Sequence, residues 1–67
     1  MTSKAEKVLS DLVNGNLQDA KRLAREVSAD ALSDCARWEF GWSTERAHYA
    51  ILYLKCGGTF QRYCDAN

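Results

Sequence analysis

The sequence contains no proline, only four glycines, and no hydrophobic run near the roughly 18 residues that a transmembrane helix requires. Its longest apolar stretch spans residues 49–54 and is bounded by His48 and Lys55. The first seven residues lack the apolar core of a signal peptide and already carry Glu6. We therefore expect a small helical domain that stays in the cytoplasm and does not enter a membrane.

An excess of charge of either sign is also absent, because nine Lys and Arg residues balance nine Asp and Glu residues. This balance argues against functions that depend on a strongly basic or acidic field. Hydrophobic residues make up 46% of the chain and charged residues 27%, which indicates a folded rather than a disordered chain. A length of 67 residues excludes two-domain enzymes, nucleotide-binding α/β folds and barrels. Residues 1–67 are predicted to form one small domain.

The three cysteines do not follow a pattern typical of disulfide-linked or metal-binding proteins. Their odd number, without a secretion signal, favours reduced thiols. No C-x-x-C pair is present, and His48 and Cys56 would lie about 12 Å apart along one helix, too far to share a zinc ion with ligands at roughly 2.0–2.3 Å. We expect no metal and no cofactor, with Cys35 and Cys56 as small core side chains and Cys64 as the most exposed thiol.

Motifs that carry catalysis are missing as well. A nucleophilic cysteine needs a neighbouring histidine, but the single histidine, His48, lies two helical turns from Cys56. There is no serine nucleophile motif and no glycine-rich phosphate loop, and Gly57-Gly58 is interpreted as a helix stop. We expect no catalytic residues and no enzymatic activity.

The first half of the chain predicts two helices joined by a short turn. Ser3 and Glu6 have the spacing of a capping box, and Asn14-Gly15 is typical of a helix end. Asn16 is the expected cap of a second helix, whose apolar residues recur at the helical period as far as Val27. Because the turn is so short, the two helices are expected to form an antiparallel hairpin.

The second half predicts two further helices and a short final turn. Ser28 is the expected cap of a helix over about residues 29–40, which Gly41 ends. A fourth helix begins at Ser43 or Thr44 and is apolar on most of its circumference, which predicts that it lies at the centre of the fold.

The end of the chain completes the predicted architecture. Thr59 is the expected cap of one last turn over residues 60–64, and alternation typical of strands is absent. The predicted fold class is all-α, a small bundle of three to four short helices arranged as helical hairpins.

All seven aromatic residues lie between positions 38 and 63, and none precedes them. Small aliphatic side chains of the first hairpin could pack against them, or some of them could form an exposed contact surface. Tryptophan and tyrosine are enriched at protein interfaces, and a small domain without disulfides or a metal often needs a partner. We expect a homodimer or a protein partner, with interface candidates Trp38, Phe40, Trp42, Tyr49 and Tyr53.

The alternative function is binding of DNA or RNA. Lys21, Arg22 and Arg25 form a basic patch on the second helix, which could belong to a helix-turn-helix. The zero net charge opposes this interpretation, as do the acidic residues that follow, which include Asp34 and Glu39. Nucleic-acid binding is therefore kept as the second hypothesis.

Three stretches rich in aromatic residues and cysteine give the chain a resemblance to a known group. They are WEFGW at residues 38–42, YLKCGG at 53–58 and FQRYC at 60–64. In a short, charge-balanced, all-helical chain, they resemble the small early-region accessory proteins of lambda-type bacteriophages. The resemblance implies an accessory protein made early in infection, which binds a host or phage macromolecule in the host cytoplasm. It carries no functional residue over to a position of this chain.

Overall fold

The computed structural model describes residues 3–66, which form five α-helices and no strand. The helices are α1 (Lys4–Val13), α2 (Leu17–Ala24), α3 (Ala29–Trp38), α4 (Thr44–Lys55) and α5 (Phe60–Asp65). The all-α prediction is confirmed. The expected three to four helices are too few for the described residues, because the segment after Thr59 is capped and forms a helix of its own. Residues 1, 2 and 67, which the predicted single domain includes, lie outside the described part.

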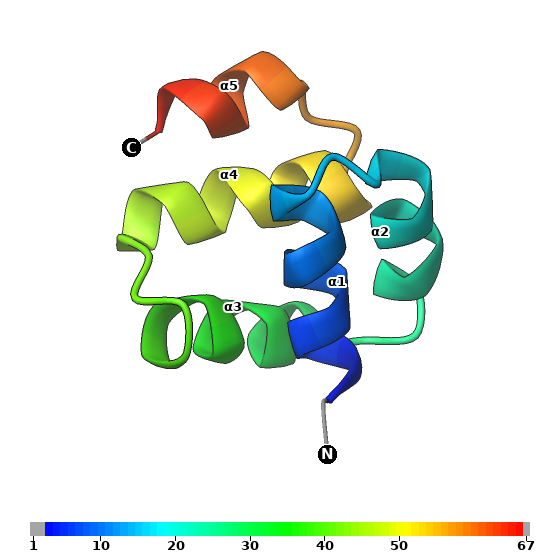
Figure 1. Ribbon diagram of the computed structural model, residues 1–67. Coiled ribbons are helices and arrows are strands. Elements are labelled where there is room, and N and C mark those ends of the chain that lie inside the picture. The colour runs from blue at the N-terminus through cyan, green and yellow to red at the C-terminus, as the bar shows by residue number, and fades with distance from the viewer. Residues whose placement is uncertain (1–2, 67) are drawn as a thin grey trace.

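Three of the helices lie in successive antiparallel rows (Figure 1). Helix α4 packs against α3 on one side and α5 on the other, while α1 crosses in front of α3 and packs on it. Helix α2 runs back alongside α1 and also contacts α4. No helix within residues 3–66 is long and apolar enough to cross a membrane.

Four of the five helices begin with a hydroxyl cap, as the sequence predicts. In each, the side-chain oxygen accepts a hydrogen bond from the backbone N–H three residues later, at 3.1–3.3 Å. The capping residues are Ser3, Ser28, Ser43 and Thr59. Asn16 precedes α2 but makes no side-chain capping bond, so the start of α2 depends more on its packing.

The third helix ends at Trp38, earlier than the predicted end near residue 40. Gly41 adopts a φ of +69°, in the left-handed region that glycine enters without a steric cost. The chain turns back there, and the N–H of Trp42 donates to the carbonyl of Ala36 at 2.9 Å. This reversal ends α3, and Phe40 packs against the core just beyond the helix.

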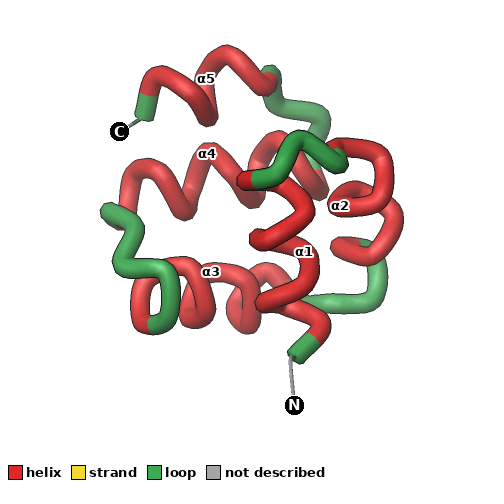
Figure 2. The backbone as a smooth tube through the Cα atoms, in the orientation of Figure 1, coloured by secondary structure: helices red, strands yellow, loops and turns green. Residues whose placement is uncertain are grey.

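The core lies where α1 and α2 pack on α3 and α4, and it consists mainly of aliphatic side chains. Its largest fully buried members are Val8, Leu9, Leu12 and Leu32. Helix α4 lies between α3 and α5 (Figure 2), in agreement with its predicted central place. It contributes Ala47, Ala50, Tyr53 and Leu54 to the buried set.

Candidate interaction surface

Five of the seven aromatic rings form one continuous series of ring contacts, of which Tyr53 and Tyr63 are buried and Phe60 is partly exposed. Phe40 contacts Trp42 with ring centroids 5.6 Å apart, and Trp42 contacts Tyr63 at 5.7 Å. Tyr63 contacts Phe60 at 5.6 Å, and Phe60 contacts Tyr53 at 5.4 Å. The series joins the α3–α4 turn, α5 and α4, so these rings hold the fold together by tilted and edge-on packing.

Two cations of the chain lie over rings of this series. The Arg46 guanidinium lies 4.2 Å from the centroid of the Trp42 ring and 5.5 Å from that of Tyr63. Arg46 Nη2 also donates a hydrogen bond to Tyr63 Oη at 3.2 Å. At the Tyr53 end of the series, Lys21 Nζ lies 4.3 Å from the centroid of the Tyr53 ring. Both cations have cation–π geometry. The contacts of Arg46 on α4 with Tyr63 on α5 stabilise the packing of these two helices.

These contacts change the set of candidate interface residues. Tyr53 is only 8% exposed, so its place on an exposed contact surface is corrected: α2 and α5 cover it. Phe40 and Trp42 are half-buried and pack against the core. Tyr49 is also half-buried and contacts the neighbouring His48 ring at 5.4 Å. The sequence pattern could not show which of the two α4 rings, Tyr49 or Tyr53, is buried, because α4 is apolar on most of its circumference.

Trp38 differs from every other aromatic residue, because 80% of it is exposed. Within residues 3–66, no ring or cation contact involves it. It stands in the last turn of α3 beside an open groove of about 560 Å³. The groove runs between the start of α1, the α2–α3 turn and α3, and the Cys35 thiol also lines it.

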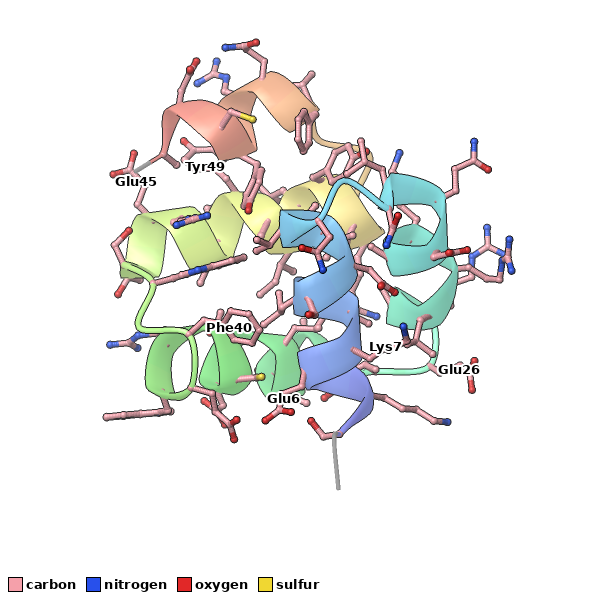
Figure 3. All side chains as sticks on the ribbon, in the orientation of Figure 1. Glu6, Lys7, Glu26, Phe40, Glu45 and Tyr49 are labelled. Atoms are coloured by element: carbon pink, nitrogen blue, oxygen red, sulfur yellow. The ribbon has the colours of Figure 1, made fainter. Side chains whose placement is uncertain are left out.

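Most of the charged side chains that line this groove are acidic, although its lining is mainly apolar. Glu26, Asp34 and Glu39 line it, while its one lysine, Lys4, is held by Glu26 at 3.0 Å. Glu6 projects from α1 in front of α3 (Figure 3) and adjoins Glu39 in a neighbouring hollow. A hydrogen bond to the Glu6 side chain and repulsion from its charge raise the pKa of Glu39 above its ordinary value of 4.5. Among the described residues, Glu6, Asp34 and Glu39 form no ion pair with a cation.

Glu39→Gln should raise the midpoint of urea unfolding at neutral pH. The raised pKa of Glu39 means that the fold favours its protonated form, so its ionisation destabilises the fold. This loss of folding stability is complete at a pH above the raised pKa, and it disappears as the pH falls below about 4.5. The gain from Glu39→Gln should therefore shrink in acid, whereas a gain that is independent of pH would show that repulsion from Glu6 is not its cause.

The three cysteines differ in burial. Cys35 is 9% exposed, and burial together with the charges of Glu39 and Glu6 raises the pKa of its thiol. Cys64 is exposed, as expected. The expectation that Cys56 is a core side chain is wrong: it follows the last turn of α4 as its C-cap, where the side chain is exposed.

Iodoacetamide should alkylate Cys56 at least about tenfold faster than Cys35 in the folded protein, because only the exposed thiolate reacts readily. Peptide mass spectrometry over a time course measures both rates, and the same reaction in urea is the control, since unfolding should remove the difference. Equal rates in the folded protein would contradict the burial of Cys35.

The basic residues of the alternative hypothesis come together on α2. Lys21, Arg22 and Arg25 line a second groove of about 530 Å³, which Tyr53 also borders. Two of these cations already have partners within the chain: Lys21 lies over Tyr53, and Arg22 Nη2 is 3.8 Å from Asp19 Oδ1. The patch therefore exists, but it is partly neutralised.

Neither metal binding nor a known relative suggests a function. Within residues 3–66, no three His, Cys, Asp or Glu side chains converge to hold a metal ion. Comparisons with protein-family models, curated proteins and solved structures find no match to this chain. The resemblance to bacteriophage accessory proteins therefore stays a prediction, and the function has to be argued from the chain's own residues.

Proposed function

We propose that this chain is a small non-enzymatic interaction protein that binds a macromolecular partner through Trp38. The observation that carries the proposal is the 80% exposure of Trp38, in a chain whose other rings contact one another or the core. An indole is the side chain that interface centres favour most strongly, since it buries a large area with few rotatable bonds. The partner is a protein or a second copy of the chain.

The setting of this role follows from the bacteriophage resemblance and is part of the same proposal. The protein acts in a bacterial cytoplasm as an accessory or regulatory factor of phage or prophage origin. Its small size suits this role, because a single exposed anchor and its groove supply the contact area without a catalytic centre.

Trp38→Ala should leave folding stability within about 0.5 kcal/mol of wild type, because an exposed side chain contributes little to the core. The same change should weaken partner binding by about 2 kcal/mol or more, roughly 30-fold in Kd. Urea unfolding measures the first effect. Sedimentation of the pure protein and capture from nuclease-treated bacterial lysate measure the second.

The control is Val13→Ala, which removes apolar surface from a residue 53% exposed on α1. It should change neither stability nor binding. If Trp38→Ala lowers stability while self-association and capture stay at the wild-type level, Trp38 is part of the fold and the proposed site is wrong.

The second candidate function is nucleic-acid binding by Lys21, Arg22 and Arg25, which is favoured by their place in one groove. This function requires an affinity that falls steeply as the salt concentration rises, because bound counterions are released from the phosphates. Captured material that disappears with nuclease, together with loss of DNA binding in Arg25→Gln, would favour it. Absence of binding at low salt would remove it.

A further inference from the structure

The surroundings of Trp38 restrict the chemistry of the partner. Trp38 and Asp34 are four residues apart on α3 and so lie on the same face of this helix. Glu39 follows as the C-cap, and Glu26 borders the groove from the α2–α3 turn. The exposed indole thus shares a groove with carboxylates from α3 and from the α2–α3 turn, of which Glu26 is paired with Lys4.

Two further features make this region favourable for a cation. The C-terminal end of the α3 dipole carries a partial negative charge near Trp38 and Glu39, although the Cys35 and Ala36 carbonyls of this turn already accept backbone hydrogen bonds. Glu6 adds a fourth carboxylate beside Glu39. The only lysine in the groove, Lys4, is paired with Glu26 and does not neutralise Asp34 or Glu39.

We infer that the groove beside Trp38 binds an arginine-bearing segment of a protein partner, with the guanidinium stacked on the indole and facing Asp34 and Glu39. A guanidinium is preferred to an ammonium because it is planar, stacks on aromatic faces and donates two parallel hydrogen bonds to a carboxylate. This inference rests on the proposed function and names the chemistry of its partner.

Other occupants fit the groove less well. Nucleic acid carries phosphates, which these carboxylates repel. A second copy of the chain would offer a basic groove that its own contacts partly occupy, because Lys21 lies over Tyr53 and Arg22 lies near Asp19. Other arginines of the chain, such as Arg37 and Arg62, are exposed, so the test has to distinguish a second copy from a different protein.

The test measures fluorescence anisotropy with three short labelled peptides, in which alanine alternates with arginine, lysine or glutamate. The arginine peptide should bind best, the lysine peptide more weakly, and the glutamate peptide not at all. Trp38→Ala should weaken the arginine peptide about tenfold or more. Trp38→Phe keeps an aromatic face and should give an intermediate affinity, and circular dichroism confirms that both variants are folded.

The carboxylates are tested with a matched pair of variants. Glu39→Gln should weaken the arginine peptide roughly two- to fivefold, the range of an exposed charge pair. Glu45→Gln makes the same change at the start of α4, in a separate hollow with Tyr49 and away from Glu6 (Figure 3), and should leave the affinity unchanged.

Four results would overturn the inference. Equal binding of the arginine and lysine peptides with no effect of Trp38→Ala would mean nonspecific charge attraction. Binding of the glutamate peptide would reverse the assigned charge. Self-association that requires Trp38 and blocks the arginine peptide would make a second copy the occupant. If a captured protein still depends on Trp38 while no peptide binds, the proposed function stands and only the arginine chemistry fails.

Discussion

Leu32→Ala is expected to leave most of the protein unfolded at room temperature. Leu32 is 0% exposed and lies among the largest fully buried side chains of the core. Truncating such a leucine costs about 2–5 kcal/mol, since it removes buried methyl groups and leaves a cavity. A domain of this size is rarely more stable than about 3–5 kcal/mol, so the change is comparable with its whole stability. Urea unfolding followed by far-ultraviolet circular dichroism measures the loss.

Val13→Ala serves as the control for this experiment, because it shortens an apolar side chain that is 53% exposed. Its unfolding free energy should stay within about 0.5 kcal/mol of wild type. An unchanged midpoint for Leu32→Ala would contradict the burial of this residue at the contact of α1 with α3.

Trp42→Ala is expected to release α5 from the rest of the fold. The change removes the ring that contacts Phe40 and Tyr63 and that covers the Arg46 guanidinium. Because Trp42 is half-buried, the expected cost lies near the lower end of the range for Trp→Ala, about 3 kcal/mol. Helix α5 packs mainly on α4, so its backbone amides should lose protection from hydrogen exchange before those of α1 and α3.

Two control variants test whether the effect of Trp42→Ala comes from losing this particular ring or from losing a tryptophan at any position. Trp42→Phe keeps an aromatic face for Arg46 and should retain most of the protection of α5. Trp38→Ala deletes the same side chain at an exposed position and should leave α5 unchanged. If the α5 amides exchange at the wild-type rate in Trp42→Ala, the aromatic series does not hold this helix in place.

The helix starts could be predicted because their cause is local. Ser3, Ser28, Ser43 and Thr59 each cap the backbone N–H three residues ahead, so a few residues of sequence contain the whole interaction. The end of α3 lies before the predicted end, because it depends on contacts beyond the helix itself. Gly41 predicts a helix stop, but the hydrogen bond from the Trp42 N–H to the Ala36 carbonyl forms only when the chain reverses.

The candidate surface was predicted only in part. Trp38 was among the interface candidates, and the structure exposes it. Judged by residue type alone, Tyr53 is an equally good interface candidate, but α2 and α5 cover it. The contacts of Arg46 could not be predicted from the sequence, because its partners Trp42 and Tyr63 are separated from each other by a whole helix and a turn.

The all-α class, the starts of the helices and the position of the aromatic residues in the second half can therefore be predicted from the sequence. These properties follow from short-range hydrogen bonds and from the period of the apolar residues. Three features emerge only from the packing of the helices: which rings are buried, the exposure of Cys56, and the contact of Glu6 on α1 with Glu39 at the end of α3. These depend on how α5 folds over α4 and how α1 crosses α3, and no local pattern encodes such contacts.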